Sequence, residues 1–242
     1  MIHINKGNSP LIISIPHAGL TVPTSIKEQM TVDGRELVDT DWYVDRLYNF
    51  TKSLNITVIT AEMSRYVIDL NRDPSDISLY PGQFTTSLCP TVTFTNKALY
   101  NDTYGVTDSE ISDRIQRFWS PYHQQITEHI QRIKEINGYA VLLDAHSIAS
   151  EVATLFDGIL PELNFGTNDG NSCSKSLIDQ LMEIDSMEYS KVLNGRFKGG
   201  YITRTYGQPE QNIHAIQLEI AQNCYMDERA LNWNNYKAQE LQ

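Results

Sequence analysis

Short runs of aliphatic and β-branched residues recur along the whole chain, separated by polar stretches. Each run is only a few residues long and is rich in Val, Ile or Leu, which is typical of strands buried on both faces of a sheet. We therefore predict strands at residues 11–17, 56–62, 65–71, 139–146, 151–156, 190–195 and 214–220.

The segments between these runs contain stretches with helical spacing or helix signals. They are residues 35–54, 108–136 and 174–184. In the second segment, Asp108 or Ser109 is a suitable N-cap, and Gly138 is a stop signal. Pro121 is predicted to kink or divide that helix, because proline lacks the amide hydrogen that a helix interior needs.

This alternation of strands and helices predicts an α/β fold. We expect a mostly parallel or mixed central sheet with helices on both faces. The chain has 242 residues, 40% of them hydrophobic, and no repeat or linker divides it, so residues 1–242 are predicted to form a single domain. Ligands of such sheets bind outside the carboxyl ends of the strands.

Charge and cysteine content narrow the class of partner and the compartment. Lys and Arg total 19 against 30 Asp and Glu, a formal charge of −11, which argues against nucleic acid or an anionic membrane as the main partner. The three cysteines are odd in number and widely spaced, as expected of reduced thiols. With no signal-like N-terminus and no run of 18 apolar residues, we expect a cytoplasmic protein.

Polar side chains occur at the ends of four of the predicted strands. The strand-end residues are His17, Asn71 with Arg72, His146 and Glu219. One such ending would be unremarkable, because strand ends are often polar. Four together indicate an active site at the carboxyl edge of the sheet.

Two of these residues are the best candidates for metal ligands. Imidazole and carboxylate groups suit a catalytic divalent metal, most readily Zn²⁺, which needs three protein ligands and an open position. His17 and His146 would supply two ligands, and the third would be Asp41 or, as the alternative, Asp45. Asp144 shares a strand face with His146 and could accept a hydrogen bond from its ring.

The remaining candidates suit general base catalysis and binding of an anionic substrate. Glu219 lies in an apolar strand, where a carboxylate is costly unless it is paired; beside a metal it becomes a general base. A buried ion pair is the competing explanation. Arg72, Arg196 and Arg204 could bind carboxylates through two parallel hydrogen bonds, so we expect a small anionic substrate.

Several longer blocks of the sequence resemble the N-formylglutamate amidohydrolase family. The blocks are IPHAG, DTDW, SRYVIDLNR, LYPGQ, LLDAHS, LFDG, LPELNFGTNDG, VLNGRFKGGYITR and HAIQLEIAQ, between about Ile13 and Asp227. The resemblance implies a fold like that of the zinc carboxypeptidases. It also implies metal-dependent hydrolysis of N-formyl-L-glutamate to formate and L-glutamate, a step of histidine degradation.

The resemblance leaves some assignments open. DLNR is similar to the segment that holds a substrate carboxylate in the related aspartoacylases, which implies that Asn71 and Arg72 bind substrate. The wider group often takes its first ligands from H-x-x-E, but Leu20 stands three residues after His17. The choice between Asp41 and Asp45, and between Arg196 and Arg204 as second anchor, stays open. The competing functions are a related N-acyl-amino-acid deacylase or carboxypeptidase-like hydrolase, and a non-catalytic amino-acid-binding module.

Overall fold

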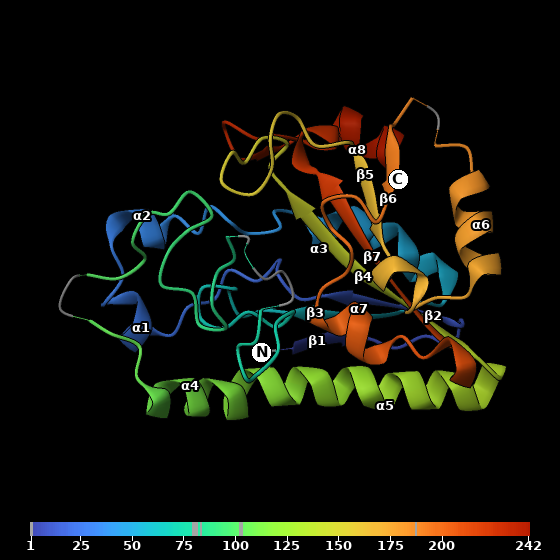
Figure 1. Ribbon diagram of the computed structural model, residues 1–242, viewed down its shortest axis with the longest axis horizontal. Coiled ribbons are helices and arrows are strands. Elements are labelled where there is room, and N and C mark those ends of the chain that lie inside the picture. Colours follow the sequence, from blue (N-terminus) through green and yellow to red (C-terminus); the bar gives the residue numbers. More distant parts are fainter. Residues whose placement is uncertain (1, 79–81, 83, 102–103, 187) are drawn as a thin grey trace.

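The long apolar runs of the sequence form the centre of a seven-stranded sheet, in which β-strands from the whole chain lie side by side (Figure 1). The structure is a computed structural model and describes residues 2–78, 82, 84–101, 104–186 and 188–242. The strands of this sheet are β1 (Ile2–Asn5), β2 (Leu11–Ile15), β3 (Thr57–Ala61), β4 (Ala140–Ile148), β5 (Leu163–Gly166), β6 (Lys191–Leu193) and β7 (Ile213–Ala221). A separate small hairpin-like pair consists of β8 (Met226–Asp227) and β9 (Asn232–Trp233).

The sheet is mixed, with a parallel centre. Its order is β1-β3-β2-β4-β7-β5-β6, and the four central strands, β3, β2, β4 and β7, run parallel. The outer strands include antiparallel pairs, β1 with β3 and β5 with β7. The chain passes from β2 to β3 on one side and later returns to β4 on the other side, which makes the carboxyl ends of β2 and β4 a topological switch point.

Helices cover both faces of this sheet. The helical segments are α1 (Thr24–Lys27), α2 (Val32–Arg35), α3 (Val44–Leu47), η1 (Tyr48–Leu54), α4 (Asp108–Arg114), η2 (Ile115–Trp119), α5 (Ser120–Asn137), η3 (Asn168–Gly170), α6 (Lys175–Glu183), α7 (Tyr201–Tyr206), η4 (Pro209–Gln211), η5 (Gln222–Cys224) and α8 (Asn235–Leu241). Ile12 packs in the core with Ile126 of α5, whereas Ile13, the next residue of β2, packs in the core with Val44 of α3. Neighbouring strand residues thus enter different cores, as the period of a strand requires. The predicted α/β fold with helices on both faces is confirmed.

The helix predicted at 108–136 exists and extends to Asn137. Thr107, rather than Asp108 or Ser109, is its N-cap and forms a capping box with Glu110. Gly138 ends it at φ 80°, as predicted. Pro121 does not divide the helix: the preceding turn widens into the π-helical segment η2, and α4 and α5 run on in one line (Figure 1).

The predicted strand at 65–71 is wrong, although its residues are buried. Apolar side chains make this stretch look like a strand, but no other strand pairs with it among the described residues. The carbonyl oxygens of Val67, Leu70 and Arg72 instead accept hydrogen bonds from the side chains of Arg114, His123 and Trp119, respectively. Side chains of the long helix therefore satisfy the backbone groups that a neighbouring strand would otherwise satisfy.

One further strand prediction is wrong, and the helical prediction at 35–54 holds only for α3 and η1. The sheet strands β1 and β5 and the short pair β8 and β9 were not predicted. Residues 151–156 form a turn in which the amides of Leu155 and Phe156 bond to Val152 O. In 35–54, the left-handed residues Leu37 and Tyr43 (φ 52° and 61°) interrupt any continuous helix. Leu163–Gly166, whose sequence continues into a turn-rich stretch, is the strand β5.

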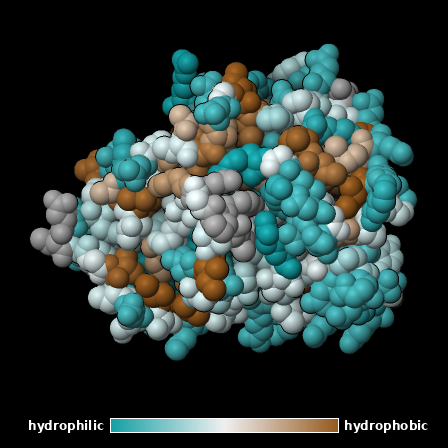
Figure 2. All heavy atoms as spheres, in the orientation of Figure 1, coloured by the Kyte–Doolittle hydropathy of each residue, from teal (hydrophilic) through white to brown (hydrophobic). Residues whose placement is uncertain are grey.

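Hydrophilic residues predominate on the face shown in Figure 2, and the hydrophobic ones form small separate patches. None of the helices in the described residues combines the length and apolar character needed to cross a bilayer.

Candidate active site

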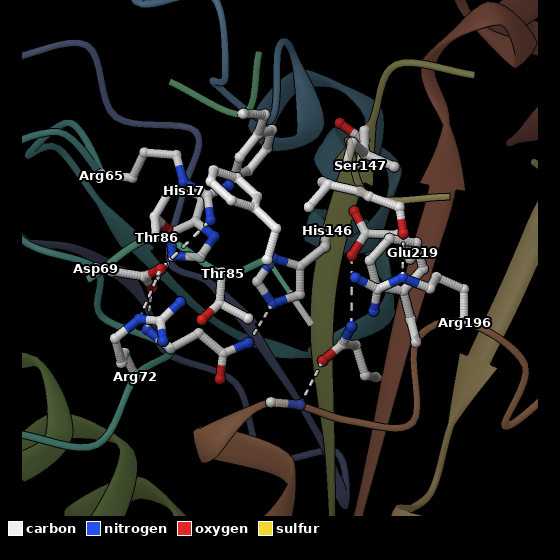
Figure 3. Close-up of a pocket in the computed structure, with 18 residues that line it drawn as sticks. His17, Arg65, Asp69, Arg72, Thr85, Thr86, His146, Ser147, Arg196 and Glu219 are labelled. Atoms are coloured by element: carbon white, nitrogen blue, oxygen red, sulfur yellow. Dashed lines mark hydrogen bonds and ion pairs between the residues drawn. The ribbon is translucent and has the colours of Figure 1, made fainter. Parts of the chain in front are cut away.

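The carboxyl ends of three adjacent strands bring the site together. His17 follows β2, His146 lies in β4 and Glu219 lies in β7, opposite His146 in the strand register. These side chains line one pocket of about 140 Å³ (Figure 3). All five predicted strand-end residues, Asn71 and Arg72 included, therefore meet at one place, as the sequence predicts.

His17, Asp41 and His146 form a compact group of side chains that could hold a metal ion, the metal-ligating group. One donor atom from each lies within 4.8 Å of the others, and all three residues are buried. Asp41 Oδ2 lies 2.9 Å from His146 Nδ1 and 3.8 Å from His17 Nδ1. The backbone holds Asp41 in place, because its amide donates to His17 O. Asp45 is exposed and is not part of this group, so the geometry supports Asp41 as the carboxylate ligand.

The other nitrogen of each histidine faces a second carboxylate. His17 Nε2 lies 2.8 Å from Asp69 Oδ1, and His146 Nε2 lies 3.0 Å from Asp144 Oδ2. Because a carboxylate accepts hydrogen bonds, each Nε2 is placed to donate to its outer carboxylate, and both Nδ1 atoms are directed toward Asp41. This is the arrangement in which imidazoles bind a metal ion.

His17 Nδ1 provides a test of whether these residues fit a cation. It is buried and has no hydrogen-bond partner in the described residues. A buried, unsatisfied nitrogen is costly, and a metal ion at this point would remove the cost. With two nitrogens and one carboxylate oxygen as donors, the group fits a divalent metal.

Burial and neighbouring charges shift the pKa values of Asp41 and His146 in opposite directions. Burial raises the pKa of Asp41, but the hydrogen bond from His146 and the charges of His17, His146 and Arg65 together outweigh burial, so the net pKa lies below the usual range. Burial also opposes the charged form of His146, yet Asp144 and Asp41 together raise its pKa well above normal. A cation would therefore displace a proton from His146 when it binds.

Arg65 and Asp69 are functional residues that our sequence analysis did not identify. The Arg65 guanidinium donates to Asp41 Oδ1 at 3.2 Å and to Asp69 Oδ2 at 3.4 Å, and it lies over the Phe94 ring. It thus fixes the carboxylate ligand and the carboxylate behind His17 together. Both are charged residues within the apolar block SRYVIDLNR, which is the signal that could have identified them.

Glu219 lies in the same pocket and is almost fully buried. Burial raises its pKa to about 8, although the nearby charge of His146 opposes the shift. Its Oε2 accepts a hydrogen bond from the Gln217 amide at 3.4 Å. A carboxyl group that binds a proton this readily is suited to proton transfer.

Three arginines line the pocket in this acidic protein: Arg65, Arg72 and Arg196. Arg72 Nε is buried, has no hydrogen-bond partner in the described part of the chain, and lies 3.8 Å from Asp69 Oδ2. Arg196 Nε donates to Leu155 O. Arg204 lies in α7 and does not line the pocket; its Nε donates to Gly199 O, just before that helix. The structure thus places Arg72 and Arg196, but not Arg204, around the cavity.

Asn71 lines the pocket, but its amide makes contacts within the protein. Its Oδ1 accepts from Ile202 N at 2.8 Å, and its Nδ2 donates to Asp144 Oδ2 at 2.9 Å. Asn71 therefore connects α7 to the carboxylate behind His146. Of the block LYPGQ, only Gly82 lies within the described residues.

Comparisons with known proteins agree with this geometry. The N-formylglutamate amidohydrolase family matches residues 9–226 of the chain. N-formylglutamate deformylase of Pseudomonas aeruginosa is 45% identical over 232 residues, which cover 95% of this chain and 87% of that protein. The protein of the same name from Pseudomonas putida is 44% identical over 230 residues, 94% of this chain and 86% of that one.

A solved structure has the same fold. The crystal structure of N-formylglutamate amidohydrolase from Ralstonia eutropha JMP134 superposes with a TM-score of 0.82 and 23% identity, covering 99% of this chain and 93% of that chain. The family match spans nearly the whole sheet and every residue of the metal-ligating group. The chain belongs to the N-formylglutamate amidohydrolase family.

Proposed function

We propose that this protein hydrolyses N-formyl-L-glutamate to formate and L-glutamate. The observation that carries the proposal is the buried His17, Asp41 and His146 group, which opens into an arginine-lined pocket beside Glu219. Relatives that carry the name N-formylglutamate deformylase at about 45% identity support it.

The metal-ligating group would hold a divalent cation, which we assign as Zn²⁺ because two nitrogens and a carboxylate oxygen suit that ion. Such a cation would polarise the formyl carbonyl and acidify water. Asp69 and Asp144 keep both histidine rings in the orientation that directs Nδ1 toward the centre.

Glu219 would transfer the proton. In our proposal its carboxylate takes a proton from the attacking water, and the carboxylic acid then gives that proton to the nitrogen of the leaving glutamate. The formyl C–N bond breaks, and formate and the free amino acid leave. Burial makes Glu219 basic enough for the first transfer.

The substrate carries two carboxylates, and we assign one to Arg72 and the other to Arg196. The unsatisfied Nε of Arg72 is a buried donor at the pocket wall, so it is suited to receive a carboxylate. Arg196 lies against apolar residues that line the same pocket, Leu155 and Phe197. These apolar groups would contact the methylenes of the glutamyl side chain.

The test measures formate release by the purified, Zn²⁺-reconstituted protein. N-formylglutamate should be hydrolysed much faster than N-acetylglutamate and N-formylnorvaline, the second of which lacks the side-chain carboxylate. Replacing either Arg72 or Arg196 with Ala should lower kcat/KM. The activation free energy should rise by roughly 2–5 kcal/mol, because a buried carboxylate then loses its partner.

One of the two arginine variants should also lose its preference for N-formylglutamate over N-formylnorvaline. The arginine replaced in that variant is the one that binds the side-chain carboxylate. Binding of N-formylglutamate without formate release would instead indicate a non-catalytic module. Faster release of acetate from N-acetylglutamate would indicate a different deacylase.

A further inference from the structure

Gln217 is a pocket residue for which neither the family resemblance nor the proposed mechanism gives a role. It lies two residues before Glu219 on β7, so both side chains project from the same face of the strand. It is only 4% exposed and lines the pocket together with Glu219. A buried amide requires partners at both of its ends, and these partners indicate what it does.

The orientation of the Gln217 amide is fixed by one strong contact. Gly200 N donates to Gln217 Oε1 at 2.7 Å. Because a backbone amide can only donate, the oxygen of Gln217 must face Gly200 and its NH₂ group must face the other way. That NH₂ group lies 3.4 Å from Glu219 Oε2 and donates to it.

Gly200 is itself held between two side chains. A Cβ on Gly200 would lie 2.5 Å from Asn71 Nδ2, so the loop approaches Asn71 as closely as a glycine permits. On its other side the Gly200 amide binds Gln217. Arg196, four residues earlier in the same loop, lines the pocket. A single side chain therefore joins this loop to Glu219.

We propose that Gln217 is a positioning residue for Glu219: it occupies Oε2, so that Oε1 is the oxygen that accepts the proton from the attacking water. The proposal deepens the proposed function and rests on the general-base role of Glu219. The geometry has a second consequence: the contact with Gly200 holds the amide in place, so the loop that carries Arg196 must be seated for Glu219 to be aligned.

Gln217→Glu tests this role with little change of shape. The new side chain retains an oxygen that can accept from Gly200, but it replaces the donor to Glu219 with an acceptor. Glu219 then loses its alignment while the loop contact remains. We expect kcat for N-formylglutamate to fall by about tenfold or more, with KM and bound Zn²⁺ unchanged within about twofold.

Asn194→Asp is the matched control. Asn194 is also an amide with two partners at the start of this loop: its Oδ1 accepts from Thr167 N at 2.8 Å and its Nδ2 donates to Thr167 Oγ1 at 2.9 Å. The substitution makes the same chemical change away from Glu219, and kcat should stay within about twofold of wild type. An equal loss of kcat in both variants would mean that loop tethering alone explains Gln217, and would overturn the proposal.

A double-mutant cycle separates this proposal from the proposed function. Glu219→Gln alone should retain Zn²⁺ and lose about 10²- to 10⁴-fold in kcat. Adding Gln217→Glu to it should cost less than about twofold more, because the group that Gln217 aligns is already gone. A further fall in kcat as large as that of Gln217→Glu alone would show that the two residues act independently, which overturns the proposal.

Two other outcomes distinguish the failures. An impaired Glu219→Gln beside a fully active Gln217→Glu would overturn the role of Gln217 and leave the proposed function standing. A fully active Glu219→Gln would overturn both the role of Gln217 and the proposed role of Glu219 as general base. If Gln217→Glu does not fold, Gln217→Met, which is similar in length and has no donor, replaces it with the same criterion for kcat.

Discussion

At the scale of single residues, each histidine of the metal-ligating group is bracketed by two carboxylates. Asp41 faces both Nδ1 atoms, while Asp69 and Asp144 bind the Nε2 atoms of His17 and His146. The outer carboxylates decide the tautomer, and the tautomer decides whether a lone pair points at the metal. Metal affinity should therefore depend on residues that never touch the metal.

Asp69→Asn tests this dependence. The amide can no longer hold the Nε2 hydrogen of His17 with a full negative charge, and it breaks the contact with Arg65. We expect the affinity for Zn²⁺ to fall by about 10- to 100-fold, measured by competition with a chelator of known affinity. Asp41→Asn should lose more, because it removes a ligand.

Asp45→Asn is the matched control for both variants. It makes the same change of acid to amide, four residues from Asp41, at an exposed position outside the group. Its Zn²⁺ affinity should equal that of the wild type. A loss of affinity in Asp45→Asn as large as that in Asp41→Asn would contradict the assignment of Asp41 as the ligand.

At the scale of elements, the central strands were predictable and the segment after β3 was not. The runs that became β2, β4 and β7 are apolar because helices cover both faces, and the pattern reports that burial directly. Residues 65–71 are equally buried, but helix side chains satisfy their backbone groups. Burial alone does not show whether backbone groups bond to a neighbouring strand or to side chains 40 or more residues away in the chain. The sequence therefore placed Asp69 in the interior of a strand.

The π-helical segment η2 contacts the backbone at Arg72, just after residues 65–71. It ends at Trp119, whose ring donates to Arg72 O at 3.0 Å and stacks on His123 at a centroid distance of 3.8 Å. The helix therefore sets the position of the backbone that carries Arg72 into the pocket.

Trp119→Phe should loosen that backbone while most of the aromatic packing remains. Arg72 O loses its donor, which should cost about 1–3 kcal/mol in the free energy of unfolding. KM for N-formylglutamate should rise because Arg72 is displaced, and Zn²⁺ content should not change. Trp233→Phe, which removes an indole donor to Asn235 at the surface, is the control and should leave KM unchanged. An unaltered KM in Trp119→Phe would show that Arg72 does not depend on the helix.

At the scale of the whole molecule, the sheet order assembles a site whose parts are distant in the chain. His17, Asp41 and His146 meet because β2 and β4 are neighbours at the switch point. The sequence predicted which residues lie at strand ends, but strand order depends on long-range packing that no local pattern contains. The same assembly places three arginines in one cavity of a protein with a formal charge of −11. These arginines would therefore attract an anionic substrate to the cavity although the net charge of the protein is negative.

The assembly also makes stability depend on pH through His123, which anchors α5 to the segment that carries the site. Burial lowers the pKa of His123 to about 4, against an ordinary value of 6.5, although its hydrogen bond with Leu70 O opposes the shift. Between these two values the unfolded chain binds a proton that the folded protein rejects. The contribution of His123 is thus complete above pH 6.5 and declines as the pH falls toward 4.

Unfolding by urea at pH 7 and pH 5 should reveal this contribution. Between these two pH values the wild type should lose about 2 kcal/mol in the free energy of unfolding through His123 alone, in addition to losses through other groups. His123→Gln keeps an NH₂ group that can donate to Leu70 O but does not titrate, so its loss over the same interval should be smaller by that amount. The variant is also expected to be less stable than the wild type at pH 7, because the stacking on Trp119 is gone. The test of the role of His123 is therefore the change in the free energy of unfolding between pH 7 and pH 5, not its value at either pH. Equal losses in both proteins would mean that His123 accepts its proton in the folded state as easily as in the unfolded one.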